Sequence, residues 1–395
     1  DWAEIIVFQG ALLSTQPWIV KTDKILVADI YDPMHLEVLE QLKAVPYGRR
    51  YLETLDVTSV MNEQLTRADF LICASDKQRD FWLGQMAALG RLNPFTYDND
   101  SSLRNLIDSV PFGVQNEPPT KTKSGIREAF PGISKTDKVI LWGGGIYNWF
   151  DPLTLVYAVD QLAKKHDNIR LVFMGTQHPN PHVPEMAMSF STRETVQKLG
   201  LLNKHVFFNE GWVPYNERAN FLLDADLGVS THLEHLETAF SFRTRILDYL
   251  WAGLPIVATT GDTFEPIIEQ NGLGITVPPG DVNALAQAIE KILYEPELAQ
   301  TLSKNVQLFA STMTWSVALR PLIQFIKNAH RSADSMNAYI SQMRRMNYLP
   351  RRSVRQRVLF FRLSWKLNGL GYTFDLFFKN LNRKIKKKFQ KSVGL

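Results

Sequence analysis

Two arginines that could bind a diphosphate, Arg243 and Arg245, lie close to a carboxylate, Asp248, in the stretch Ala225–Asp262. The stretch is predicted to run as a strand, a polar loop, a helix with a basic start, a short turn and a second strand. Amide groups at a helix N-terminus attract anions, and added cations strengthen that attraction. The spacing therefore favours a ligand that carries a diphosphate.

The helix that positions these residues is expected over Arg243–Trp251, with Ser241 as the N-cap residue. Asp248 would share a helix face with Arg245, because the two are three residues apart. Gly253 and the proline that follows it are expected to end the helix. A plain surface helix with an Arg–Asp ion pair is the alternative interpretation.

Short apolar runs alternate with helical stretches along most of the chain. This predicts parallel sheets covered by helices, with ligands beyond the carboxyl ends of the strands. A polar linker, Gln115–Ser124, separates a first α/β unit (residues 1–115) from a second (residues 116–330). The expected strands are Ile5–Gln9, Ile25–Asp29, Phe70–Cys73 and a last strand within Asp108–Val114, then Lys138–Trp142, Arg170–Met174, His205–Phe208, Leu227–Ser230, Ile256–Thr259 and Ile275–Val277. The expected helices are His35–Val45, Lys77–Leu89, Pro152–His166, Arg193–Leu199, Tyr215–Ala225, Arg243–Trp251, Thr263–Gln270 and Val282–Tyr294.

Six segments in this order resemble family 4 retaining glycosyltransferases, which have the GT-B fold of two Rossmann-like domains with a cleft between them. The segment SFRTRILDYLWAGLPIVATTGD resembles the donor-binding helix and the strand after it. The other segments are Pro111–Val114, Val139–Gly145, Leu171–Gly175, Val206–Pro214 and Pro278–Ile289. The resemblance spans about residues 70–330 and implies transfer of a sugar from a nucleotide sugar.

The resemblance also implies roles for individual residues. Arg245, with Arg243 as a second cation, would hold the diphosphate, where fixed positive charge stabilises the departing group. Asp248 would hydrogen-bond the ribose hydroxyls. Further donor-binding residues would be Gly144, Gly145, Gly175, Trp212, Val213 and Glu265. The donor would carry UDP, GDP or dTDP, and neither a metal nor another cofactor is expected.

The chain departs from the family pattern at three places. Two glutamates eight positions apart are usual, but Asp248 replaces the second and Phe240 stands at the first, so we expect Glu237 to take its place. The basic residues that usually follow the glycine turn are missing from Ile146–Pro152. The first unit looks short for a complete domain, which suggests missing upstream sequence. Asp29–His35 follows a strand end and could face the cleft, although His35 itself is expected to be an ordinary residue at a helix start.

Charge is distributed unevenly along the chain. The 395 residues carry a net charge of +4, but residues 341–395 hold 15 basic residues and one acidic residue. Phe374, Phe378, Leu381, Ile385 and Phe389 recur there at helical spacing. This predicts a basic amphipathic helical tail, residues 331–395, that docks on an anionic membrane. Packing of the tail on the acidic body and binding of nucleic acid are the alternatives.

These patterns predict a glycosyltransferase on the cytoplasmic face of the membrane that acts on a glycan or a lipid-linked acceptor, in cell-surface polysaccharide or glycolipid synthesis. A non-catalytic sensor or scaffold that binds nucleotide sugars is the second hypothesis. The single cysteine, Cys73, excludes an internal disulfide. Asp98-Asn-Asp100 resembles a metal motif but is expected to form a turn. His232 and His235 are expected to lie in a loop at the cleft edge, since no third metal ligand has suitable spacing.

Overall fold

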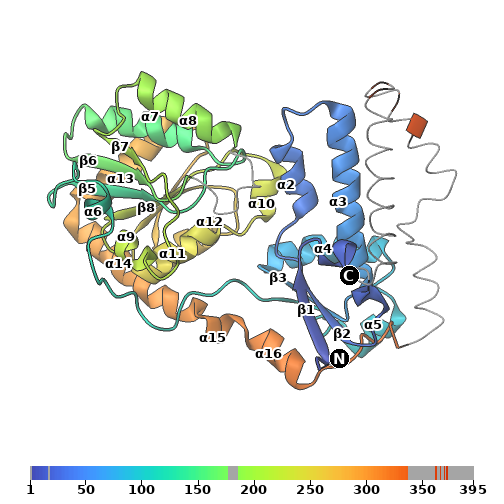
Figure 1. Ribbon diagram of the computed structural model, residues 1–395. Coiled ribbons are helices and arrows are strands. Elements are labelled where there is room, and N and C mark those ends of the chain that lie inside the picture. The colour runs from blue at the N-terminus through green and yellow to red at the C-terminus, as the bar shows by residue number, and fades with distance from the viewer. Residues whose placement is uncertain are drawn as a thin grey trace.

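The chain folds into two α/β domains, each built on a parallel sheet (Figure 1). This computed structural model describes residues 2–16, 18–176 and 186–336, with a few single positions between 361 and 371. The amphipathic pattern predicted from Phe374 to Phe389 therefore lies outside the described residues. Within the described part of the chain, no helix is long and apolar enough to cross a membrane.

The first domain has a four-stranded sheet in the order β1-β2-β3-β4, with all neighbours parallel. Three of its strands match their predicted bounds, whereas the fourth, Ile107–Ser109, includes only the first two residues of the predicted Asp108–Val114. The longest helix of this domain, α3, was not among the expected elements. The strands are β1 (Ile5–Gln9), β2 (Ile25–Asp29), β3 (Phe70–Cys73) and β4 (Ile107–Ser109). The helices are α1 (Leu12–Thr15), η1 (Ile19–Lys21), α2 (Met34–Gln41), α3 (Tyr47–Arg67), α4 (Asp76–Ala88) and α5 (Pro94–Asn99).

The second domain has a six-stranded parallel sheet in the order β10-β9-β8-β5-β6-β7. This is the doubly wound topology that the strand–helix alternation predicts. The strands are β5 (Lys138–Trp142), β6 (Ile169–Phe173), β7 (Val206–Phe208), β8 (Leu227–Ser230), β9 (Ile256–Thr259) and β10 (Gly274–Val277). The helices are α6 (Ile126–Ala129), α7 (Pro152–Ala163), α8 (Ala187–Lys198), α9 (Arg218–Leu222), α10 (Leu236–Phe240), α11 (Thr244–Ala252), α12 (Glu265–Asn271), α13 (Val282–Tyr294) and α14 (Pro296–Ala310).

Helices cover both faces of this second sheet, which explains its unbroken apolar strands. Every residue of β8 and β9 is buried. One core joins the sheet to α7, α8 and α13, and another joins it to α9, α11 and α12. Strands buried on both faces leave their carboxyl ends as the place where polar loops can gather.

Two segments cross between the domains, and they pair with each other. The amide of Val114 donates to Met313 O at 2.8 Å, and the amide of Trp315 donates to Val114 O at 3.0 Å. At Gly113 a Cβ atom would lie 2.6 Å from the backbone nitrogen of Trp315, so the close approach requires glycine. The two crossings therefore form one paired connection.

After the second crossing the chain returns to the first domain through η2 (Ser311–Met313), α15 (Trp315–Ala318) and α16 (Arg320–Lys327). Phe325 of α16 stacks on Phe70 of β3, with ring centroids 4.3 Å apart. Arg91 and Asp334 form a fully buried ion pair with an N–O distance of 3.0 Å. The end of the predicted second unit is thus part of the first domain's packing, as the orange helices in Figure 1 show.

Candidate active site in the cleft between the domains

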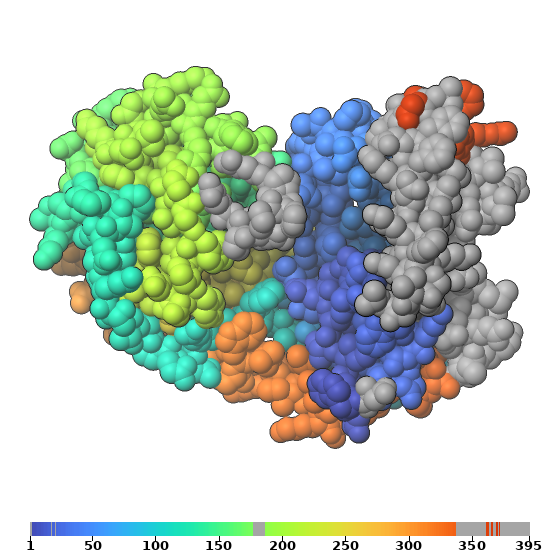
Figure 2. Space-filling model, viewed as in Figure 1, coloured from blue at the N-terminus to red at the C-terminus, as the bar shows by residue number. Residues whose placement is uncertain are grey.

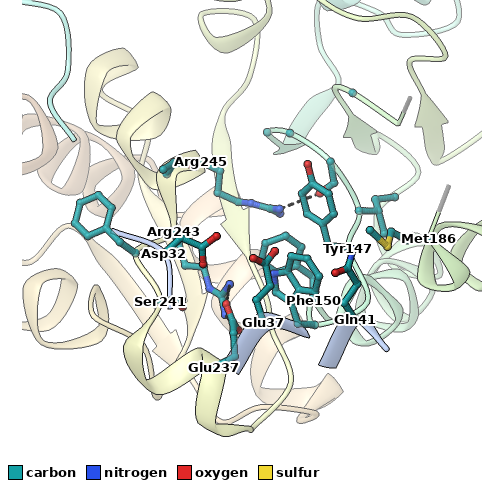
Figure 3. A pocket seen from close by; sticks show the side chains of 18 of the residues that line it. Asp32, Glu37, Gln41, Tyr147, Phe150, Met186, Glu237, Ser241, Arg243 and Arg245 are labelled. Atoms are coloured by element: carbon teal, nitrogen blue, oxygen red, sulfur yellow. Dashed lines mark hydrogen bonds and ion pairs between the residues drawn. The ribbon is translucent and has the colours of Figure 1, made fainter. Parts of the chain in front are cut away.

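A cavity of about 900 Å³ lies between the two domains, at the carboxyl ends of strands from both sheets. Figure 2 shows the two lobes that enclose it, and Figure 3 shows the side chains inside. We call it the interdomain cavity. The first domain contributes Tyr31, Asp32, Pro33, Glu37, Gln41 and Phe112. The second contributes Gly143–Tyr147, Trp149, Phe150, Gly175, Thr176, Met186, Ser189, Trp212, Glu237 and Ser241–Arg245.

Arg243 and Glu237 form a two-point ion pair on one wall of this cavity. Nη1 and Nη2 of Arg243 donate to the two carboxylate oxygens of Glu237 at 3.0 and 2.9 Å. Both side chains are buried, and the guanidinium also lies 4.9 Å from the ring centre of Phe150. Paired guanidinium and carboxylate groups hold each other in fixed orientations. Glu237 therefore neutralises Arg243 within the protein.

The helix start differs from the prediction. Helix α11 begins at Thr244, and Arg243 is the residue before it, without a side-chain cap. Ser241 is not the N-cap: it follows α10, and its hydroxyl donates to Thr238 O at 3.1 Å. The unpredicted short helix α10 takes up the residues that were expected to be loop. The predicted end is confirmed, because Gly253 has a left-handed φ of 68°.

Arg245 has an unused donor at the cavity. Its Nη2 donates to Gly145 O at 3.0 Å, while its buried Nη1 has no hydrogen-bond partner among the described residues. The guanidinium lies 4.1 Å from the ring centre of Trp142 and 4.0 Å from that of Phe150. Burial lowers the pKa of Arg245 to about 10, so the side chain is still a cation at neutral pH. A buried cation with a free donor is suited to an anionic ligand.

Tyr249 fixes the glycine turn next to this arginine, a role that the sequence did not reveal. Its hydroxyl accepts from the amide of Gly143 at 2.8 Å and donates to the carbonyls of Leu141 and Val229. Its ring lies directly on Gly228, where a Cβ atom would come within 2.4 Å. One buried phenol thus ties β5, β8 and α11 together below the cavity.

A second cavity, of about 280 Å³, shares Arg245 and the glycine turn with the first. Asp248 lines this cavity, and its carboxylate lies 3.1 Å from Nη1 of Arg218. Burial raises the pKa of Asp248, and the charge of Arg218 opposes that shift. The guanidinium of Arg218 stacks on Tyr215 and Trp251 at 3.8 and 4.8 Å. Arg245 therefore lines both adjoining cavities, whereas Asp248 lines the smaller one.

Two carboxylic acids of the first domain, Asp32 and Glu37, face the interdomain cavity (Figure 3). They share a hydrogen bond, and burial followed by the charge of Asp32 raises the pKa of Glu37 to about 9. Burial also raises the pKa of Asp32. Asp32 belongs to the segment expected near the cleft, whereas Glu37 was not predicted. A carboxylate in the first turn of the helix that follows a strand was the available signal.

His35 and Phe240 belong to the contact between the domains. His35 stacks on Phe81 with ring centroids 5.4 Å apart, and burial lowers its pKa to about 4. The ring of Phe240 lies 4.7 Å from the same Phe81. The Nε2 of Gln78 donates to Tyr31 O at 2.6 Å and to Phe240 O at 2.8 Å. Phe240, at the place of the family's first glutamate, therefore holds the second domain against the first.

Of the other predicted donor-binding residues, some line the interdomain cavity and two lie outside it. Gly144, Gly145, Gly175 and Trp212 line the interdomain cavity. Val213 packs on the apolar core instead. Glu265 lies in a different cavity with Asp262 and Ser75, where its carboxylate accepts from the amide of Gly261 at 2.7 Å.

Two signals that the sequence raised are ordinary local structure. Asp98 and Asn99 are the end of helix α5 and do not form the expected turn, and Asp100, which follows the helix, accepts from the amides of Ser102 and Asn105. His235 accepts from the amide of Thr238 at the start of α10. His232 is fully buried, with its Nε2 3.5 Å from Asp262.

Residues 126–309 match the family model of the glycosyl transferases group 1. This part of the chain is similar to that family. Solved glycosyltransferase structures align with both domains, and the two-sheet architecture is the GT-B fold. Comparison with the curated protein sequences found no match.

Three solved structures illustrate the similarity. Sucrose-phosphate synthase from Thermosynechococcus elongatus is 18% identical, with a TM-score of 0.58, over 82% of this chain and 73% of that chain. HepE from Anabaena, solved with UDP and glucose, is 17% identical, with a TM-score of 0.61, over 82% and 78%. WaaG, a glycosyltransferase involved in lipopolysaccharide biosynthesis, is 17% identical, with a TM-score of 0.54, over 80% and 81%. At these identities the similarity establishes the fold of the two domains.

Proposed function

We propose that this protein transfers a sugar from a nucleotide sugar to a glycan or lipid-linked acceptor, with retention of configuration and without a metal. The observation that carries the proposal is Arg245, a buried cation whose Nη1 has no partner among the described residues. It lies where two cavities meet, in the part of the chain that matches the glycosyl transferases group 1. A diphosphate beside Arg245 and the N-terminus of α11 would have its charge balanced by protein groups.

The two cavities support an orientation for the donor. The nucleoside would lie toward Asp248 and the aromatic residues of the smaller cavity, and the sugar toward Glu237 and Arg243 in the larger one. UDP is our first choice of nucleotide among UDP, GDP and dTDP, because HepE was solved with UDP-glucose. A thermal-shift series with the three nucleotides tests the choice, because a ligand that binds only the native state raises its melting temperature.

The first prediction concerns Arg245→Ala. Loss of one buried, preorganised donor to a developing charge reduces turnover by roughly 10²- to 10³-fold, and Arg245→Lys should recover part of the loss. The measurement is nucleotide release from the donor with EDTA present, which also tests the metal-independent part of the proposal. Arg104→Ala, which removes an exposed arginine of the first domain, is the control. Unchanged turnover in Arg245→Ala would refute the assigned role.

A non-catalytic protein that binds nucleotide sugars is the second candidate. The segment after the glycine turn has no basic residue, and Phe240 is used for domain contact rather than at the sugar. Transfer of sugar, or hydrolysis of the donor, by the intact chain would eliminate this candidate. A raised melting temperature with no turnover of any donor would favour it.

We further propose that the protein acts at the cytoplasmic face of a membrane, in synthesis of a cell-surface polysaccharide or glycolipid. The 15 basic residues of positions 341–395 support this, because anionic lipids attract such segments. Flotation of the full chain with anionic but not with neutral vesicles tests it, and an oligonucleotide shift assay tests the competing nucleic-acid role.

A further inference from the structure

The wall of the interdomain cavity that the first domain supplies is acidic. Asp32 follows β2 and Glu37 lies in the first turn of α2, and their carboxyl groups are hydrogen-bonded to each other. Across the cavity lies Glu237, close enough for its charge to act on both groups. Figure 3 shows the three carboxyl groups gathered in front of Arg243.

Among the described residues that line the cavity, the first domain supplies no cation to accompany these acids. The first-domain residues lining the cavity are Tyr31, Asp32, Pro33, Glu37, Gln41 and Phe112, and none of these six is basic. Among the described lining residues, the cations are Arg243 and Arg245. Glu237 already neutralises Arg243 through two hydrogen bonds. A phosphorylated group on the first-domain side would therefore meet carboxyl groups without a free cation.

The same wall can bind hydroxyl groups. Burial and the neighbouring Asp32 raise the pKa of Glu37 to about 9, so Glu37 keeps its proton at neutral pH and donates it to Asp32. The other carboxyl oxygens of the pair are left as hydrogen-bond acceptors. Sugar hydroxyls are donors of the matching kind and bring no charge that the buried pair would have to balance.

Independent features of the cavity indicate that a ligand occupies it. The Nη1 of Arg245 is a buried donor that has no partner among the described residues, at the end that we assign to the donor diphosphate. Tyr147 and Trp149, stacked with ring centroids 5.0 Å apart, line the same cavity and offer an apolar surface. Its volume of about 900 Å³ leaves room for a second sugar beside the transferred one.

We propose that the Asp32–Glu37 pair is the acceptor subsite and that it selects an uncharged sugar hydroxyl over a phosphorylated acceptor. This inference rests on the proposed function, because it assumes that the donor occupies the Arg245 end of the cavity. It adds to that function the chemical class of the acceptor and the two residues that recognise it.

The second prediction tests this with the full chain and UDP-glucose as donor. Methyl glucosides and methyl galactosides are compared with their 6-phosphates, and UDP release is measured above the rate with water alone. We expect each neutral glycoside to raise release at least tenfold more than its phosphate. Glu37→Lys should reverse the preference, because it adds the missing cation. Asp32→Asn should raise the KM for the neutral glycoside while the KM for UDP-glucose stays within about twofold.

The controls separate this inference from the proposed function. Glu53→Gln, an exposed acid of α3, should behave as the wild type. If no nucleotide raises the melting temperature and no donor is turned over, the proposed function fails and the inference with it. If UDP-glucose is bound and hydrolysed, the inference alone is overturned by three results: equal use of phosphates, no stimulation by any neutral glycoside, or an unchanged preference in a folded Glu37→Lys variant.

Discussion

Burial shifts the pKa values of Glu37 and Arg245 in opposite directions. Burial favours the neutral form of each group, which raises the pKa of Glu37 to about 9 and lowers that of Arg245 to about 10. Glu37 is therefore protonated at neutral pH, whereas Arg245 keeps its charge. A neutral acid and a charged guanidinium can thus lie on two walls of one cavity and bind different parts of a substrate.

The third prediction concerns the stability of Glu37→Gln as a function of pH. The folded pKa of Glu37 is about 9 against an ordinary value of 4.5, so the native state holds a proton that the unfolded chain lacks between these values. Wild-type stability therefore falls as pH rises from about 5 to 9, and glutamine removes this dependence. The melting temperature of the variant, relative to the wild type, should rise across that interval.

The control for the pH series is Glu53→Gln, whose exposed side chain pairs with Arg49 at 3.8 Å. Its difference in melting temperature from the wild type should stay constant from pH 5 to 9. A constant difference for Glu37→Gln as well would mean that Glu37 titrates in the native state as it does in the unfolded chain.

The sequence predicted some residues of the interdomain cavity and missed others. Arg243, Arg245 and Glu237 were predicted because they lie within one segment of nine residues. The meeting of Glu37 with Glu237 could not be predicted, because 200 positions separate them and the domain contact brings them together. Ser241 was assigned as an N-cap because serine favours that position, but the four residues before it form the end of α10.

At the scale of elements, Gln78 of helix α4 in the first domain is hydrogen-bonded to the end of α10, just before the loop that carries Arg243. Gln78 is fully buried, and its amide bridges Tyr31 O and Phe240 O while its Oε1 accepts from the amide of Ala74. The Asp32 loop and the end of α10 are thus held at a fixed separation. Gln78 is a positioning residue, since it does not line the interdomain cavity.

The fourth prediction follows from this bridge. Gln78→Met keeps the side chain's length but removes the hydrogen bond to Phe240 O across the domain contact and the one to Tyr31 O within the first domain. Turnover should fall at least tenfold while the KM for the nucleotide sugar changes little, because the donor-binding residues all belong to the second domain. Gln85→Met, on the same helix but bonded only to Asn62 within its own domain, is the matched control. A parallel rise in KM would contradict a pure positioning role.

The elements of the second domain were more predictable than those of the first. Strands such as Lys138–Trp142 and Ile256–Thr259 are continuous apolar runs, and the structure has them at the predicted bounds. Helix α3 was missed although it has 21 residues. The composition of α3 is polar on average, and charged residues interrupt its apolar ones. Its helical conformation is therefore determined by packing against α2 and β2 and not by its hydrophobic pattern.

At the scale of the whole molecule, the segment Arg331–Ser335 anchors to the domain in which the chain began. Asp69 accepts from Arg331, Ser332 and Ser335, and Arg91 pairs with Asp334 out of contact with water. This return could not be predicted, because the residues concerned look like an ordinary polar stretch and their partners lie more than 240 positions away.

The fifth prediction concerns that anchor. Asp334→Ala leaves the guanidinium of Arg91 buried without its counter-ion, although Leu65 O and Ala68 O still accept from it. Breaking one partner of a buried pair costs about 3–5 kcal/mol, measured as the free energy of unfolding in urea. Asp160→Ala, which removes an exposed pair with Lys164, should change it by less than about 1 kcal/mol. Equal effects of the two variants would show that the Arg91 pair contributes no more than a surface pair.

The paired crossings at Val114 and Thr314 limit how the two lobes can move. A single flexible linker would let one lobe both swivel and hinge. Two hydrogen-bonded segments side by side resist twisting about their common axis, because a twist would shear the bonds between them, but they still allow bending across it. Any separation of the cavity walls would then be a bending across this connection, and it would have to break the hydrogen bond from Gln78 to Phe240 O. Asp32 and Arg245 would return to the same alignment once that bond formed again.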